Sequence, residues 1–293
     1  MVVADVPNWA FGKICKAIKK YCKDWDVHFY YMNWDRKQKY DLSHHKKFDL
    51  IFYLCDWYPE RLESYRVPKE KIILAVRSDV NNLFYTSNKL RECASALAVA
   101  NKNLYERFKH LHPEVKVCPG GVDVRLFRPK DAFSHNEPLV VGWAGSKENP
   151  SLRGLSFIEK ACNKVGYIYN PAYREDKWRT EEEMVKYYQD EIDIYVDMSN
   201  SAGRQNGLIE AGSCGIPLIS TRVGIAAQLI KDGVNGYLVD RDVDSLSNAL
   251  LQIRSNLEKF RKGMRRTILQ SWSWESQIKL FQDLFNKFYM ARS

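Results

Sequence analysis

The feature that most constrains the fold is the order of two kinds of segment: short apolar runs alternate with amphipathic stretches. The runs are three to five residues long and mostly continuous in apolar character, which is typical of strands buried on both faces of a parallel sheet. Parallel strands need a crossover connection, so this order predicts βαβ units and a doubly wound α/β sheet. We expect strands at 2–6, 27–31, 50–54, 72–76, 96–100, 115–118, 139–143, 167–169, 192–196, 217–220 and 236–239.

The stretches between these runs predict the crossover helices. In Lys13–Lys23, the residues Ile14, Ala17 and Ile18 mark one helical face, and the lysines lie mostly off it. Further helices are expected near 151–163, 180–189, 208–214 and 226–231, then a longer one from about 244 to 260 and a last one over 274–288.

Proline and polar residues interrupt the alternation at Phe127–Pro138, which predicts a linker. A chain of 293 residues also favours two domains over one. We therefore expect a Rossmann-like domain at 1–130, a second at 137–270 and a C-terminal helix at 271–293. Ligands of such sheets bind outside the carboxyl ends of the strands, so the two domains are expected to face a central cleft.

The stretch Asn200–Ser220, NSAGRQNGLIEAGSCGIPLIS, combines a glycine-bearing loop with one carboxylate, Glu210. A helix that begins near Asn206 would present the unpaired N–H groups of its first turn to an anion such as phosphate. Gly203 and Gly207 would let that anion approach the backbone. Glu210 would accept hydrogen bonds from vicinal hydroxyls, as a carboxylate does with ribose. The alternative is a tight loop with a solvent-facing acid.

A second anion-binding loop is predicted in VVGWAGSKENPSLRG. The backbone amides near Gly145 and Ser146 and the guanidinium of Arg153 could hold a diphosphate, because arginine suits bidentate contact. An arginine on a solvated first turn is the alternative reading. Both loops follow strands of one sheet, which favours a shared nucleotide-sugar site.

Charge and composition restrict the partners. The first 136 residues carry 24 Lys and Arg against 16 Asp and Glu, and the rest carry 21 against 20. A basic first half suits an anionic partner or surface, and a basic face that serves only solubility is the alternative. No apolar run approaches the ~20 residues of a membrane helix, and no signal peptide is recognisable. We expect a cytoplasmic protein whose membrane contacts are peripheral, with its seven cysteines as buried thiols.

The second half resembles the GT-B glycosyltransferases, and most closely the retaining glycosyltransferase family 4. The resemblance is carried by NGLIEAGSCGIPLIS, by KDGVNGYLV, by VKVCPGGVDVRLFRP and by the closing SWSWESQ. It covers roughly Val115 to the end, and the first domain matches weakly. It implies a GT-B fold with a C-terminal helix that crosses back to the first domain. It also implies retention of anomeric configuration, with a nucleoside-diphosphate sugar as co-substrate and neither cofactor nor metal.

The resemblance also implies roles for individual residues. Glu210 corresponds to the second acid of the family's acid pair, which holds the donor ribose. Asn206, Gly207 and Leu208 lie in the segment beside the diphosphate, Arg153 replaces a phosphate-binding lysine, and Gly12 lies near the glycine loop that faces donor and acceptor. The chain departs from the pattern at three positions: Ala202 stands for the first acid, Trp143 for an arginine and Gln228 for a glutamate. Arg204 or Gln205 could take over part of the first acid's role.

The expected function is the transfer of a hexose or pentose to a hydroxyl of an anionic acceptor: a glycan, a lipid-linked glycan or a modified DNA base. Arg153 and Glu210 are the expected catalytic residues. In the first domain, the acceptor candidates are Trp9, Gly12, Arg77 and Asp79; core packing of Trp9 and an Arg77–Asp79 ion pair are the alternatives. Two other functions stay open. One is a non-catalytic or epimerase-like sugar-nucleotide-binding protein, and the other is a basic nucleic-acid-binding module, which predicts steeply salt-dependent binding to DNA.

Overall fold

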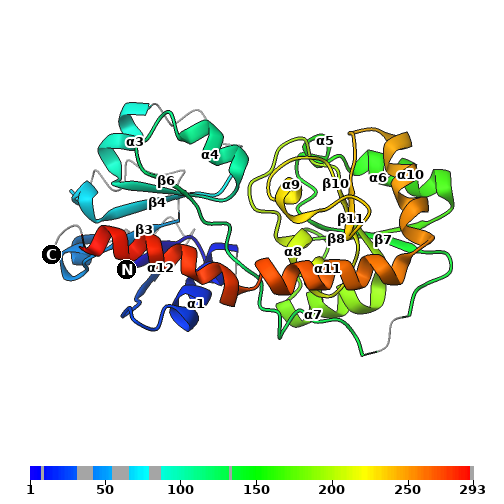
Figure 1. Cartoon of the computed structure of the whole chain (residues 1–293), viewed down its shortest axis with the longest axis horizontal. Helices are drawn as coiled ribbons and strands as arrows, with labels where there is room; N and C mark the ends of the chain where they lie inside the picture. The colour runs from blue at the N-terminus through cyan, green and yellow to red at the C-terminus, as the bar shows by residue number, and fades with distance from the viewer. Residues whose placement is uncertain (8–9, 32–41, 55–65, 79–86, 132–133, 291–293) are drawn as a thin grey trace. The chain divides into compact units, whose positions relative to one another are not determined.

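The computed structural model describes residues 1–7, 10–31, 42–54, 66–78, 87–131 and 134–290. The chain forms two compact units, shown in Figure 1. The first comprises residues 1–120 together with 274–293, and the second comprises residues 121–273. Among the described residues, no helix is both long and apolar enough to cross a lipid bilayer.

The first unit is built on a parallel sheet with the strand order β2-β1-β3-β4-β5-β6. Its strands lie where the apolar runs predict them: β1 Val2–Ala4, β2 Phe29–Tyr31, β3 Ile51–Tyr53, β4 Ile72–Val76, β5 Ala96–Val99 and β6 Val115–Val117. Its helices are α1 Ala10–Tyr21, α3 Ser87–Cys93, α4 Lys102–Phe108 and α12 Trp274–Met290, with 3-10 turns at Leu42–Lys47 and Lys69–Lys71. Helices α1 and α12 cover one face of the sheet, and α3 and α4 cover the other.

The C-terminal helix α12 returns to the first unit, as the GT-B resemblance implies. Its apolar stripe is buried against β1, β3 and α1. Phe281 is fully buried, and its ring centroid lies 5.8 Å from that of Phe52 and 6.3 Å from that of Phe285. At the helix end, the Trp25 indole N–H donates to Asn286 at 3.2 Å. The helix expected over 274–288 is therefore present, and its aromatic residues pack in the core of the first unit.

The second unit has a parallel sheet with the order β11-β10-β9-β7-β8. The strands are β7 Val140–Gly145, β8 Ile168–Tyr173, β9 Ile194–Asp197, β10 Leu218–Ser220 and β11 Gly236–Leu238. The helices are α5 Pro150–Arg153, α6 Leu155–Val165, α7 Glu181–Lys186 followed by a π-helical turn at Tyr187–Glu191, α8 Asn206–Ser213, α9 Ala226–Leu229, α10 Val243–Arg254 and α11 Leu257–Ser271. Helices α6 and α10 pack on one face, and α8 and α11 pack on the other.

Two helices expected to be continuous are broken. The helix near 151–163 divides into α5 and α6 at Gly154, whose φ of +69° is a left-handed conformation that suits glycine. A Cβ at this position would lie 2.3 Å from the Met198 carbonyl oxygen, so only glycine fits. The stripe from 244 to 260 divides into α10 and α11 around Ser255 and Asn256, a break that the apolar periodicity does not show.

The predicted linker is largely part of the second unit, because its ends are held there. Phe127 is 2% exposed within the core beside α8 and α11, and Arg265 donates to its carbonyl oxygen at 3.0 Å. The buried Asp193 carboxylate accepts hydrogen bonds from the backbone N–H groups of Asn136 and Val140, and Arg261 donates to it at 3.2 Å. The second unit accordingly begins at Gly121 rather than near residue 137.

Removing the Phe281 ring should destabilise the first unit. We expect Phe281→Ala to lower the free energy of unfolding by about 3–5 kcal/mol, the range for deleting a fully buried phenylalanine. The matched control is Met290→Ala on the same helix, where the side chain is 69% exposed and the change should stay within about 0.5 kcal/mol. Denaturant unfolding of the full chain measures both. Equal midpoints for the two variants would contradict the packing assigned to α12.

Candidate functional site

The strand order of the second sheet identifies one place where a ligand is expected. The chain passes from β7 outward to β8 and then returns to β9 on the other side of β7, so the direction of winding reverses between β7 and β9. Doubly wound sheets bind their ligands outside the carboxyl ends of the strands at this switch point. The two loops predicted to bind anions follow β7 and β9. The fold therefore brings them to the same edge of one sheet.

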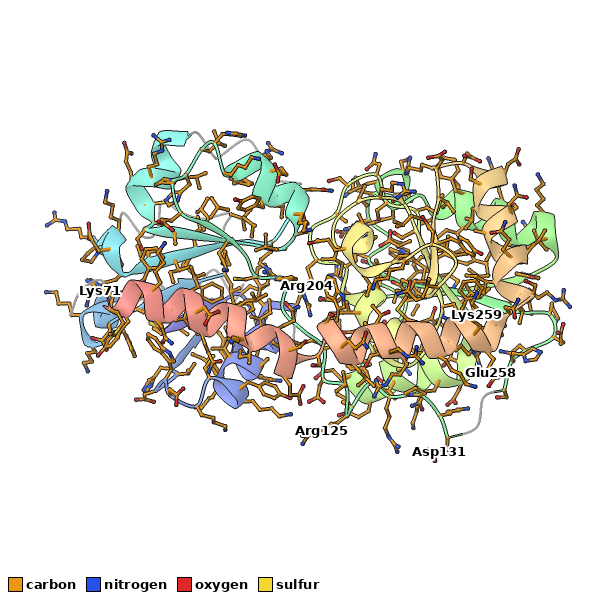
Figure 2. All side chains as sticks on the ribbon, viewed as in Figure 1. Lys71, Arg125, Asp131, Arg204, Glu258 and Lys259 are labelled. Carbon is orange, nitrogen blue, oxygen red and sulfur yellow. The ribbon has the colours of Figure 1, made fainter. Side chains whose placement is uncertain are left out.

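Helix α8 presents its first turn at this edge. The helix begins at Asn206, and the preceding residue, Gln205, makes no side-chain cap to it. The first N–H groups of a helix have no partner within the helix, and they carry the positive end of its dipole. Arg204, labelled in Figure 2, adds a guanidinium that donates to the Asn206 side chain and to the Gly121 carbonyl oxygen at 2.6 Å. A cation beside a positive helix end favours an anionic ligand at this position.

The loop that leads into α8 is held by buried polar contacts. The Asp197 carboxylate, at the end of β9, accepts from the Ser199 N–H at 2.9 Å and from the Gln205 amide at 3.3 Å. The same Gln205 amide accepts from the Ile225 N–H at 3.0 Å. Gly224 allows this contact, because a Cβ there would lie 2.3 Å from the Gln205 amide oxygen. Gln205 thus joins the ends of β9 and α8 to the turn after β10, and its amide is occupied internally.

Glu210 lies in the second turn of α8 and is only 7% exposed. The alternative of a solvent-facing acid is therefore wrong. The Tyr188 hydroxyl donates to one oxygen of the Glu210 carboxylate at 3.2 Å. Ala202, which stands where the family has its first acid, is half-buried in the loop before Arg204 and offers no side-chain polar group.

The loop after β7 already holds a carboxylate of the chain itself. The Ser146 hydroxyl donates to Glu175 at 2.5 Å, and the Lys147 N–H donates to the other Glu175 oxygen at 2.9 Å. These bonds favour the ionised acid, and the Ser146 contact first and the Lys147 contact second lower the pKa of Glu175 to about 2. The Ser146 hydroxyl and the Lys147 N–H of this loop are therefore occupied by Glu175, and the predicted diphosphate contact stays a prediction.

Arg153 ends the short helix α5 beside the loop that leads to α8. The Asn200 N–H donates to the Leu152 carbonyl oxygen at 3.0 Å, which joins α5 to that loop. Arg241 strengthens the junction by donating to the Met198 carbonyl oxygen at 2.7 Å. Within the described part of the chain, the half-buried Arg153 side chain forms no hydrogen bond or ion pair. Its guanidinium is thus available to a ligand at this edge.

Two glycines of the predicted sites serve internal packing. A Cβ on Gly207 would lie 2.0 Å from the Tyr195 hydroxyl, and one on Gly145 would lie 2.7 Å from the Trp143 ring. Packing therefore requires glycine at both positions, whether or not a ligand binds. The Leu208 side chain is fully buried in the core of the second unit, and its backbone N–H donates to the Gln205 carbonyl oxygen at 3.2 Å.

The structure describes two of the four acceptor candidates of the first unit, Gly12 and Arg77. Trp9 and Asp79 lie outside the described residues. Arg77 is 5% exposed and donates to the carbonyl oxygens of Cys118 and Pro119 at 2.7 Å each. Gly12 lies in the first turn of α1 rather than in a loop, where a Cβ would lie 2.0 Å from the Pro7 carbonyl oxygen.

The sequence did not predict the buried tyrosines and the aspartate that pack against the candidate site. Tyr187, Tyr188 and Tyr195 are all buried next to α8 and the end of β7, and Asp197 holds the loop. The signal was the run YYQDEIDIYVD, in which tyrosines flank a buried strand. Among the described residues, no group of three or more His, Cys, Asp or Glu side chains is placed to hold a metal ion.

Part of the chain is similar to a known protein family. Residues 140–256 match the sequence model of the family Glycosyl transferases group 1. The chain is 22% identical over 224 residues to the probable sucrose-phosphate synthase of Thermosipho melanesiensis, covering 62% of this chain and 52% of that protein. It is 29% identical over 154 residues to D-inositol 3-phosphate glycosyltransferase of Corynebacterium urealyticum, covering 50% and 35%. The chain thus spans about half or less of these curated relatives.

Solved structures share the fold along nearly the whole chain. The structure of Anabaena HepE in complex with UDP superimposes with a TM-score of 0.69 at 12% identity, covering 98% of this chain and 99% of that one. Sucrose-phosphate synthase from Thermosynechococcus elongatus gives a TM-score of 0.67 at 15% identity, covering 85% and 76%. Part of the second unit, residues 140–256, therefore matches the Glycosyl transferases group 1, and the chain shares its two-domain fold with these solved glycosyltransferase structures.

Proposed function

We propose that this protein transfers a sugar from a nucleoside-diphosphate donor to a hydroxyl acceptor. One observation carries the proposal: α8 presents an uncapped first turn, with Arg204 beside it and Glu210 one turn further, at the switch point of the second sheet. Phosphate groups bind well at such helix ends. A buried carboxylate one turn away suits the vicinal hydroxyls of a ribose.

In the proposed donor complex, each group has a separate task. The first-turn amides of Asn206 and Gly207, with Arg153 and Arg204, hold the diphosphate, whereas the Leu208 N–H already donates to the Gln205 carbonyl oxygen at 3.2 Å. The backbone at Gly145 lies beside this anion site, and the Ser146–Lys147 turn would contribute to it only by exchanging the Glu175 carboxylate for a phosphate. Glu210 accepts hydrogen bonds from the ribose hydroxyls. UDP is the first nucleotide to test, because the structures of HepE and of the pneumococcal O-GlcNAc transferase are complexes that contain UDP.

The proposed reaction breaks the bond between the anomeric carbon and the diphosphate oxygen, and the bonding electrons leave with the diphosphate. The acceptor oxygen bonds to the same carbon, and its proton passes to the departing diphosphate. The barrier depends on the charge that develops on the diphosphate, and oriented amides and guanidinium groups stabilise such charge. We assign this role to Arg153, Arg204 and the α8 dipole, without a metal ion. Retention of configuration is part of the proposal and rests on the resemblance to family 4.

The acceptor is proposed to be anionic: a glycan, a lipid-linked glycan or a modified DNA base. The support is the basic first half of the chain, where the exposed residues of α1 and the segment after it include Lys16, Lys19, Lys20 and Lys23. A cytoplasmic location of the protein, with peripheral contact to membranes, fits an anionic acceptor.

A second candidate is a protein that binds a sugar nucleotide without transferring the sugar. Ala202 at the position of the first acid favours it, because the structure places no carboxylate there and the Gln205 amide is occupied by Asp197 and Ile225. Incubation of UDP-glucose and UDP-GlcNAc with a panel of anionic acceptors, followed by detection of product and of free UDP, separates the two. Transfer supports the enzyme, and tight binding with no turnover supports the binding protein.

Donor binding should stabilise the protein through Glu210. We expect one of the UDP-, GDP-, dTDP- or ADP-sugars to raise the melting temperature, since a ligand at a hundred times its dissociation constant contributes about 2.7 kcal/mol. Glu210→Ala should remove most of this shift, measured against its own ligand-free melting curve. Glu258→Ala, at an exposed position on α11, is the control that should keep it. An undiminished shift in Glu210→Ala would contradict the ribose contact.

Arg153 should contribute to affinity without contributing to folding. A hydrogen bond to a charged group contributes about 1.5–3 kcal/mol, so Arg153→Ala should weaken UDP binding roughly 10- to 150-fold. Its melting temperature without ligand should match that of the wild type, because the side chain makes no bond within the described chain. Isothermal calorimetry measures the affinity, with Lys259→Ala on α11 as a control for loss of positive charge. Equal UDP affinities for the two variants would rule out a phosphate contact by Arg153.

The β7 loop should respond to acid through Glu175. The folded protein lowers the pKa of this carboxyl from 4.5 to about 2, so the contacts to Ser146 and Lys147 are fully present above pH 4.5 and are lost as the pH falls toward 2. We expect a carboxyl carbon NMR titration of Glu175 to show a midpoint near 2. Ser146→Ala should raise this midpoint, because it removes the largest cause of the shift. A wild-type midpoint at 4.5 would show that the loop does not hold the acid.

A further inference from the structure

Three tyrosines form a buried layer under the candidate site of the second unit. Tyr187 and Tyr188 are fully buried, and Tyr195 is 2% exposed. The ring centroids of Tyr187 and Tyr188 lie 5.4 Å apart, and those of Tyr188 and Tyr195 lie 6.1 Å apart. Each hydroxyl bonds to an element of the site. We call these three residues the tyrosine layer.

Two members of the layer hold the end of β7. The Trp143 N–H donates to the Tyr187 hydroxyl at 3.1 Å, and that hydroxyl donates to the Asn170 carbonyl oxygen at 2.6 Å. The Ala144 N–H donates to the Tyr195 hydroxyl at 3.1 Å. These bonds fix the backbone immediately before the anion-binding loop that begins at Gly145.

Two glycines make room for the layer. A Cβ on Gly142 would lie 2.6 Å from the Tyr187 hydroxyl, and one on Gly207 would lie 2.0 Å from the Tyr195 hydroxyl. Gly142 belongs to β7, and Gly207 belongs to the first turn of α8. The layer therefore contacts both elements that carry the candidate anion loops, and the sequence provides the space for those contacts.

Tyr188 is the member that bonds to a proposed ligand-binding side chain. Its hydroxyl donates to Glu210 at 3.2 Å, and its ring packs against Phe127 with centroids 6.2 Å apart. Tyr188 lies in the π-helical turn that follows α7, and such turns occur frequently at functional sites. Burial, and then the charge of Glu210, raises the pKa of Tyr188 well above its ordinary range, so the phenol keeps its proton and stays a donor.

We propose that Tyr188 is a positioning residue that fixes the Glu210 carboxylate in the orientation that receives the ribose hydroxyls of the donor. The inference rests on the proposed function, because it assumes that Glu210 contacts a ribose. A buried carboxylate on a flexible glutamate side chain has several rotamers, and a fixed hydrogen bond to one oxygen selects among them. Ligand contacts gain most when the contacting group is held in place by neighbours of this kind.

The test compares UDP with 2′,3′-dideoxy-UDP, which lacks both ribose hydroxyls. If another nucleoside diphosphate among GDP, dTDP and ADP binds instead, that nucleotide and its form without ribose hydroxyls replace the UDP pair. In the wild type, we expect UDP to bind more tightly than the dideoxy form. Tyr188→Phe keeps the ring and removes the hydroxyl, and it should weaken UDP binding about 3- to 10-fold. Binding of the dideoxy form should change less than about 2-fold, so the preference for ribose falls.

Two further variants separate positioning from packing. Glu210→Ala should abolish the ribose preference, and adding Tyr188→Phe to it should cause no further loss, because the two groups act as one unit. Tyr237→Phe is the matched control: this half-buried tyrosine packs on Phe260 on the opposite face of the sheet and should leave both affinities unchanged.

Each outcome has a distinct meaning. A ribose preference that survives Tyr188→Phe overturns the positioning role and leaves the proposed function in place. If Tyr188→Phe loses the same affinity for UDP and for its dideoxy form, the Tyr188 hydroxyl contributes to the general stability of the second unit. This result also overturns the positioning role. Failure of the wild type to bind any of the four diphosphates overturns the proposed function itself, and the role of Tyr188 with it.

Discussion

The first turn of α8 has backbone N–H groups that the helix itself cannot satisfy, and the candidate site is organised around them. The N-cap residue Gln205 does not use its side chain for capping, because its amide bonds to Asp197 and Ile225 instead. Arg204 adds a positive charge where the helix dipole is already positive. This concentration of positive groups favours an anionic ligand, and the diphosphate of the proposed donor has the matching charge.

In the loop after β7, hydrogen-bond donors of a similar kind already hold an anion, which is a carboxylate of the chain itself. The Ser146 hydroxyl and the Lys147 N–H hold the Glu175 carboxylate, and their hydrogen bonds account for its lowered pKa. A ligand phosphate at this loop would meet donors that already have a partner. The α8 tip and Arg153 are therefore the stronger candidates for the main phosphate contacts, and the β7 loop serves as their neighbour at the switch point.

The strands and most of the helices follow from the sequence, because a buried parallel strand needs only a continuous apolar run. The helix breaks at Gly154 and at Ser255–Asn256 do not follow, since the apolar periodicity continues across both. Asn206, Gly207 and Glu210 could be placed at a helix start from the spacing alone. The aspartate and tyrosines beneath them could not, because a buried polar group shows its role only through its partner.

The sequence by itself determined two doubly wound parallel sheets, a glycine-bearing loop before a short helix, and the acid in that helix. Only the tertiary structure showed that packing constrains Gly207 and Gly145, because a side chain there would meet the Tyr195 and Trp143 side chains. It also decided that Arg77 holds the carbonyl groups of Cys118 and Pro119. The reason is that side-chain roles depend on neighbours distant in sequence, whereas strand and helix formation depends on residues nearby.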